Sequence, residues 1–177
     1  MHRIEKTKNE LEKIFHDYGF NDKRKPHAEG LVLQYFVRSK QFLSAAAIVE
    51  NESSQLYMPY LHLQGQSIEL ALKGYLLACK LEPKEIHDLA KLASKAEDHG
   101  LALKQIEASS IILLNHHYFQ DLSTKTKFKS RYPTKTQEAT GGPMPDKKVI
   151  IDLHESIVKQ ANKKCEFLAL LTYVQST

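Results

Sequence analysis

Apolar residues recur along most of the chain at the three- and four-residue spacing of a helix, among charged and polar residues. The spacing predicts a helix over residues 3–19, which Gly19 ends, and a second helix over residues 28–51. The second helix is expected to bury one apolar stripe, formed by Leu31, Tyr35, Phe42, Ala45, Ala46 and Val49.

Proline, aspartate and glycine mark the limits of the next two helices. A third helix follows the break near Pro59 and continues to about residue 80. Asp88 is the expected N-cap of a short helix over residues 89–96, and Gly100 is placed to end it. The third helix is expected to bury one face, formed by Ile68, Ala71, Leu72, Tyr75, Leu76 and Cys79.

Two further helices are predicted in the second half of the chain, over residues 102–122 and 146–173. His154 lies on the apolar stripe of the last helix, and we interpret it as a hydrogen-bonded core histidine. No run of alternating polar and apolar residues predicts a strand, so we expect an all-α, up-and-down bundle of five or six helices. The inward candidates of the first of these two helices are Ile106, Ile111, Leu113, Leu114, Tyr118 and Leu122.

Composition favours one folded helical domain over residues 1–177, because 42% of the residues are hydrophobic and 26% are charged. Within it we expect an N-terminal helical addition over residues 1–25 and a bundle over residues 28–175. No apolar run reaches the ~18 residues of a membrane span, and no signal-peptide core is present. Cys79 and Cys165 are too few for a metal site, so a reduced cytoplasmic setting is expected.

Positive charge is concentrated in residues 124–148, where five proline and glycine residues predict a loop. Seven basic and two acidic residues give this basic loop a charge of 7 − 2 = +5, whereas the other 18 basic and 19 acidic residues sum to −1. Positive charges interleaved with aromatic rings can neutralise phosphates and stack on bases. The candidates for this role are Lys127, Lys129, Arg131 and Tyr132, and a solvated loop kept soluble by its charge is the alternative.

Common catalytic motifs are missing from the sequence. It contains no Gly-rich phosphate loop, no His-Glu-x-x-His helix and no nucleophile elbow. The adjacent His116 and His117 point to different faces of a helix and therefore cannot chelate one ion together. We expect neither a metal site nor a cofactor.

Two short motifs stand out in the middle of the chain. Glu69 precedes Lys73 by four residues, which is the favourable order for an ion pair on a helix. This pair either orients two helices or contacts a ligand. His87 opens the sequence HDLAKL, in which the structural interpretation of His87-Asp88 is helix capping.

A third motif, Arg131-Tyr132-Pro133, follows the predicted helix that bears Tyr118. Together the three motifs resemble the HEPN family of small helical domains over about residues 30–170. Members of that family carry Glu-x-x-x-Lys on a long helix and His-x-Leu at the start of the next helix. One large branch adds Arg-Tyr-Pro after a helix that bears a tyrosine.

The resemblance implies a helical bundle, usually a homodimer, that works on or near nucleotides and RNA. Many members are metal-independent ribonucleases of toxin or defence systems, and they use an arginine followed by four to six residues and a histidine. Arg3, Arg24, Arg38 and Arg131 all lack such a histidine. The chain is therefore closer to the non-nuclease branches, which bind nucleotides or pair with a nucleotidyltransferase partner.

The leading hypothesis is a non-catalytic, cytoplasmic homodimer that binds a nucleotide or RNA and contacts no membrane. Basic side chains would hold phosphate, Tyr132 or Tyr118 would stack on a base, and the Glu–Lys pair would line or brace the groove. One alternative is an atypical ribonuclease in which His116 or His117 meets Arg131, and another is a scaffold that associates through its apolar last helix. The candidate binding residues are Glu69, Lys73, Tyr118, Lys127, Lys129, Arg131 and Tyr132.

Overall fold

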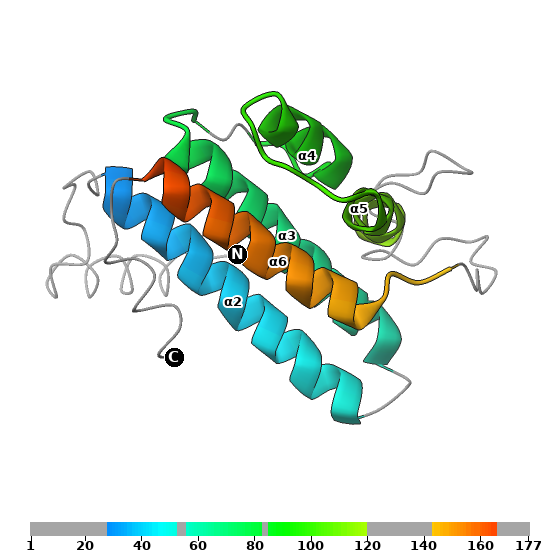
Figure 1. Ribbon diagram of the computed structural model, residues 1–177. Helices are drawn as coiled ribbons and strands as arrows, with labels where there is room; N and C mark the ends of the chain where they lie inside the picture. The colour runs from blue at the N-terminus through cyan, green and yellow to red at the C-terminus, as the bar shows by residue number, and fades with distance from the viewer. Residues whose placement is uncertain (1–27, 53–55, 83–84, 120–142, 166–177) are drawn as a thin grey trace, which may run out of the picture.

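The computed structural model describes residues 28–52, 56–82, 85–119 and 143–165, and these ranges contain helices but no strand. The all-α prediction is confirmed for this part of the chain, whereas the helix expected over residues 3–19 lies outside it. None of the helices described is long and apolar enough to cross a membrane. The helices, labelled as in Figure 1, are α2 (Ala28–Glu52), α3 (Tyr57–Ala78), α4 (Leu89–Glu97), α5 (Gln105–Tyr118) and α6 (Lys147–Lys164).

Helix α3 is the centre of the bundle and packs against α2, α4, α5 and α6. Figure 1 shows the three longest helices, α2, α3 and α6, running side by side, with α4 and α5 on one side of them. Cys79 at the end of the predicted face of α3 is only half-buried. The rest of that face is confirmed, with an exposed fraction of 0% at Ile68, Ala71, Leu72, Tyr75 and Leu76.

The buried stripe of α2 differs from the predicted one. Of the predicted residues only Ala46 is buried, and the others are partly exposed. The stripe includes the polar Ser39, whose hydroxyl donates to the carbonyl of Phe36 at 2.8 Å and lies 2.8 Å from His154 Nε2 on α6. Because this partner belongs to another helix, apolar spacing within α2 could not place Ser39 in the core. The buried residues of α2 are Val32, Phe36, Ser39 and Ala46.

His154 is the hydrogen-bonded core histidine that the sequence predicts, with an exposed fraction of 4%. Burial, together with the positive charge of Lys40, lowers the pKa of its imidazole to about 4. The ring is therefore neutral at pH 7. Because the hydrogen of the Ser39 hydroxyl goes to Phe36, Nε2 of His154 donates to Ser39 Oγ.

Helix α5 begins three residues later than predicted because α6 holds the preceding backbone. The Ala102 amide donates to Gln160 Oε1 at 2.8 Å, and Gln160 Nε2 donates to the Ala102 carbonyl at 2.9 Å. The inward prediction for Ile106 is wrong, since this side chain, next to the first residue of α5, is 59% exposed. The predictions are confirmed for the buried Ile111, Leu114 and Tyr118.

Helix α6 begins as predicted, with Asp146 as its N-cap accepting a hydrogen bond from the Val149 amide at 3.1 Å. It ends at Lys164, and Cys165 has extended backbone angles. The predicted continuation to residue 173, with its apolar tail, lies outside the described residues.

Candidate functional site

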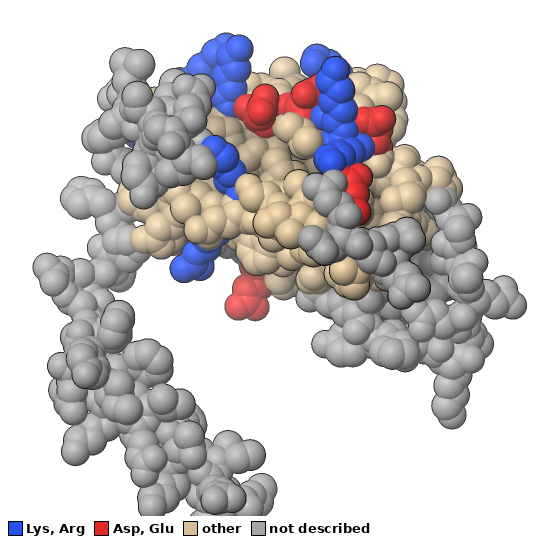
Figure 2. Space-filling model, turned by 90° about the horizontal axis from the view of Figure 1, so that it is seen from below, with Lys and Arg blue, Asp and Glu red and all other residues tan. Residues whose placement is uncertain are grey.

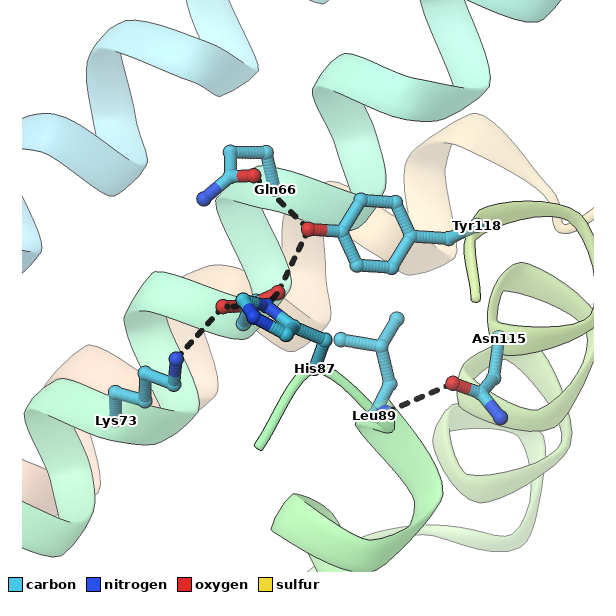
Figure 3. A network of polar contacts seen from close by, with 7 residues as sticks. Gln66, Lys73, His87, Leu89, Asn115 and Tyr118 are labelled. Carbon is cyan, nitrogen blue, oxygen red and sulfur yellow. Dashed lines mark hydrogen bonds and ion pairs between the residues drawn. The ribbon is translucent and has the colours of Figure 1, made fainter. Parts of the chain in front are cut away.

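The carboxylate of Glu69 is the centre of a polar network that joins α3, the start of α4 and α5 (Figure 3). Lys73 Nζ lies 2.8 Å from Oε1, and the Tyr118 hydroxyl donates to Oε2 at 2.6 Å. His87 Nδ1 lies 3.1 and 3.2 Å from the two carboxylate oxygens. Burial of a charge costs free energy unless it is paired and hydrogen-bonded. These three donors therefore explain how Glu69 remains only 3% exposed at its side chain.

The predicted ion pair between Glu69 and Lys73 is present and lies within α3, where a spacing of four residues places both side chains on one face. The side chain of Lys73 is only 10% exposed. The pair alone does not connect two helices. The connections to the start of α4 and to α5 come from His87 and Tyr118, which bind the same carboxylate.

Tyr118 reaches Glu69 because α3 has a glycine at position 65. A Cβ atom on Gly65 would lie 2.3 Å from both Cγ and Cδ2 of Tyr118, so the ring lies directly against the helix backbone. Its hydroxyl also lies 2.9 Å from Gln66 Oε1. The hydroxyl has one hydrogen, which it donates to the closer Glu69. The Gln66 side-chain amide, turned so that its nitrogen faces the hydroxyl, then donates to the hydroxyl oxygen.

The motif His-Asp-Leu gives each of its residues a separate structural role. His87 binds Glu69, and Asp88 caps α4 by accepting from two backbone N–H groups at 3.1 and 3.2 Å, as predicted. Leu89 is 0% exposed, and its amide donates to Asn115 Oδ1 at 2.8 Å. Asn115 Nδ2 in turn lies 3.2 Å from Asp88 Oδ1, so α5 takes part in capping α4. The motif thus fixes the start of α4 against both α3 and α5.

The network contains the residues of two of the sequence motifs, and a family comparison covers the same part of the chain. The model of the HEPN domain matches residues 33–169. The chain belongs to the HEPN domain family. No curated protein and no solved structure matches it. The Glu69 network lies wholly within the matched HEPN region, and so does the Arg131-Tyr132-Pro133 sequence.

Four residues that the sequence predicts to bind a nucleotide or RNA lie outside the described residues. They are Lys127, Lys129, Arg131 and Tyr132. The positions at which the chain leaves and re-enters the described structure are close to the network. The described residues stop at Phe119, one residue after Tyr118, and resume at Pro143. The Pro143 carbonyl lies 3.3 Å from Nε2 of His117, in the last turn of α5. The described residues before and after this gap, Phe119 and Pro143, therefore both lie at the C-terminal end of α5.

Solvent access differs sharply among the network residues. Tyr118 is 0% exposed, and in this structure its ring offers no face to solvent. By contrast, the side chain of His87 is 44% exposed. Lys91, which lies four residues later in the first turns of α4, has a side chain that is 76% exposed. His87 and Gln66 are thus the partly exposed members of the network, Lys91 lies beside them on α4, and the carboxylate of Glu69 is buried with Lys73 and Tyr118.

The adjacent His116 and His117 differ in burial, since His117 is 8% exposed and His116 is half-buried. Their ring centroids are 4.8 Å apart in an edge-on arrangement. In the parts of the chain described above, no three His, Cys, Asp or Glu side chains are grouped so as to hold a metal ion.

Sequence reasoning did not assign site roles to Gly65, Gln66, His87 and Asn115. A signal existed for Asn115, which precedes Tyr118 by three residues and so lies on the same face of α5. For His87 the signal was the histidine of the His-Asp-Leu motif, which was interpreted as a cap. The close contact at Gly65 depends on the packing of α5 against α3, which no local pattern reveals.

Proposed function

We propose that this HEPN protein binds a nucleotide or RNA without catalysis, through the basic and aromatic residues predicted as contacts in the basic loop of residues 124–148. The observation that supports it most is that the described residues on either side of these positions, Phe119 and Pro143, both lie at the C-terminal end of α5, since the Pro143 carbonyl lies 3.3 Å from His117 Nε2.

The residues divide into two roles under this proposal. Lys127, Lys129 and Arg131 contact phosphate, and Tyr132 stacks on a base. Glu69, Lys73 and Tyr118 brace the surface, because their polar atoms are buried and bind one another.

The absence of the Arg-x4-6-His sequence supports a non-nuclease branch of the HEPN family, of the type with Arg-Tyr-Pro. A metal-independent ribonuclease is the second candidate, and a specific observation favours it. An imidazole held by a carboxylate, as His87 is held by Glu69, is a common arrangement of a general base. In that case His87 replaces His116 and His117 as the first histidine to test.

We further propose that the protein acts as a cytoplasmic homodimer, or together with a nucleotidyltransferase-type partner, in a toxin–antitoxin, defence or nucleotidyltransferase-associated system. Figure 2, viewed from below relative to Figure 1, shows a broad uncharged area with charged side chains mainly along one border. Helix α2 also exposes Ile48, at 64% of its surface. Depletion of charged side chains is the compositional signal of the core of a protein–protein interface.

The experiment that tests the proposal is incubation of the full chain with labelled single-stranded RNA in EDTA, followed by native and denaturing gels. We expect a shift that weakens with salt and no cleavage. Alanine at Lys127, Lys129 and Arg131 should abolish the shift. The matched control replaces three exposed lysines elsewhere, Lys80, Lys159 and Lys163, and should retain it.

Three other results would contradict this proposal. Cleavage in EDTA would indicate the ribonuclease, and equal loss of binding in both triple variants would indicate non-specific attraction. If neither a shift nor cleavage occurs, and ATP does not bind in calorimetry, a protein-interaction scaffold remains. Light scattering on the same sample measures whether the chain is a dimer.

A further inference from the structure

We propose that the predicted N-terminal helix of this chain, residues 3–19, packs against an apolar stripe of α2. The stripe consists of residues that the sequence predicted to be buried and that the structure leaves half-buried. The described helices therefore cover it only in part. Its members are Leu31, Tyr35, Phe42, Ala45 and Val49, and we call them the α2 stripe.

The α2 stripe faces away from α6. Helix α2 lies at the edge of the bundle, with α3 as its main packing partner (Figure 1). On its buried face, Ser39 lies 2.8 Å from His154 Nε2 on α6, and the positive charge of Lys40 acts on the same imidazole. Helical spacing places Lys40 on one flank of the buried face and the α2 stripe on the other flank.

Apolar side chains continue from the α2 stripe onto α3. Gly74 faces α2, because a Cβ atom at this position would lie 2.8 Å from Cε1 of Phe36. Leu70 precedes Gly74 by four residues and Leu77 follows it by three, so both leucines lie near the same face of α3. Both are half-buried. The α2 stripe and these leucines thus form one elongated apolar surface.

The predicted N-terminal helix matches the α2 stripe in length and in pattern. It precedes residues 33–169, so it is an addition to the matched HEPN region. From Ile4 to Tyr18, as from Leu31 to Ala45, the chain advances 14 residues, which is about 21 Å along a helix. The apolar residues of this segment recur at helical spacing and form one face. They are Ile4, Leu11, Ile14, Phe15 and Tyr18.

The connection between the predicted helix and α2 sets their relative direction. Residues 20–27 are eight residues, a length that commonly joins neighbouring antiparallel helices. In the antiparallel pairing Tyr18 lies beside Leu31, and Ile4 lies beside Ala45. The apolar face of the segment therefore follows the α2 stripe over its length.

Charge supports the same pairing. At its centre Leu11 lies beside Arg38, which is exposed on α2. Glu10 and Glu12 flank Leu11 in the sequence. Acidic residues of the segment therefore meet a positive charge at the edge of the α2 stripe.

Two other occupants of the α2 stripe fit less well. A segment joined to α2 reaches this surface at an effective concentration of about 1 mM, which a second copy does not match in dilute solution. The apolar residues after Cys165 follow α6, which lies on the far side of α2 from the stripe.

The test measures hydrogen exchange of the full chain by mass spectrometry, over residues 3–19 and over α3 as an internal check of folding. An isolated helix of this length is marginal in water, so slow exchange of residues 3–19 reports packing. Two pairs of variants each add one negative charge. L11D changes the apolar face of the segment and N9D its polar face, whereas A45D changes the α2 stripe and S44D an exposed neighbour.

We expect residues 3–19 to exchange about tenfold or more slowly in the wild type, N9D and S44D than in L11D and A45D. Exchange within α3 should stay slow in all five proteins. The protection should be the same at about 1 μM and at about 100 μM protein, because the contact is within one chain. If A45D does not fold, R38E replaces it, since Arg38 is exposed and its reversal of charge should also speed the exchange of residues 3–19.

Fast exchange of residues 3–19 in the wild type, or equal protection in both members of either pair, would overturn the proposal. Protection that rises with protein concentration would overturn it in favour of a second copy. A change at residues 166–175 in place of residues 3–19 in A45D would overturn it in favour of the end of the chain.

Discussion

Replacement of Gly65 by alanine tests whether close contact between α3 and α5 holds the Glu69 network together. The new Cβ atom would lie 2.3 Å from Cγ and Cδ2 of Tyr118 and 2.8 Å from its Cβ. Rotation of the tyrosine side chain moves Cγ and Cδ2 but not Cβ, so it cannot remove the whole overlap. Relief requires α5 to move away from α3, and that movement also separates the Tyr118 hydroxyl from Glu69, which lies 2.6 Å away.

Three effects determine the expected change in the free energy of unfolding. Alanine in place of glycine inside a helix adds about 1 kcal/mol of stability. Overpacking of a tight contact removes about 1–3 kcal/mol, and loss of a hydrogen bond to a charged group removes about 1.5–3 kcal/mol. The G65A variant should therefore be less stable than the wild type by about 1.5–5 kcal/mol, despite its higher helix propensity.

The assay is urea unfolding followed by far-UV circular dichroism, with G30A as the matched control. A Cβ atom on Gly30 in α2 meets nothing within 4 Å, so G30A should be neutral or gain up to about 1 kcal/mol. A G65A protein as stable as G30A would refute the reasoning. A double-mutant cycle adds a specific check, because G65A should become stabilising in a Y118A background, where the clashing ring is absent.

Two further predictions concern stability away from the network. The pKa of His154 is lowered from 6.5 to about 4, so between these pH values the unfolded chain binds a proton that the native state excludes. The free energy of unfolding, measured by urea titration, should therefore fall by about 3 kcal/mol on acidification through this window. H154Q should lack that loss. The same acid response in H154Q would contradict the assignment to His154. Lys80 follows α3 with φ 62°, in a left-handed conformation that glycine adopts without strain. K80G should therefore raise the free energy of unfolding by about 1 kcal/mol, which urea unfolding would show as a higher midpoint. A lower midpoint would show that the lysine side chain stabilises this turn.

The sequence predicted the features of the fold that depend on residues close together in the chain. The buried face of α3 and the Asp88 cap follow from helical spacing and from capping chemistry, and both are present. The buried stripe of α2 was wrong because Ser39 enters the core through a bond to His154 on another helix. The start of α5 was wrong for the same kind of reason, since the backbone before it is held by α6.

The candidate site was predicted in part for the same physical reason. The pair of Glu69 and Lys73 lies within one helix, so its spacing revealed it. Tyr118 was placed among the candidates for stacking on a base, whereas the structure places its ring against Gly65 and its hydroxyl on Glu69. His87 reaches the same carboxylate from the connection between α3 and α4. Convergence of three segments on one carboxylate is a property of packing and has no local signature.

The structural roles of the motif residues explain why the HEPN motifs do not by themselves indicate activity. Glu69, Asp88 and Asn115 are buried, and each of them ties one helix to another or caps α4. A chain can therefore need these residues for the joint between α3, α4 and α5 whether or not it cleaves RNA. Differences in function must come from groups that a ligand can reach, which in and beside this network include His87, Gln66 and Lys91. A change at these exposed groups that alters RNA binding, with the stability of the joint retained, would separate the two roles of the motif within one protein.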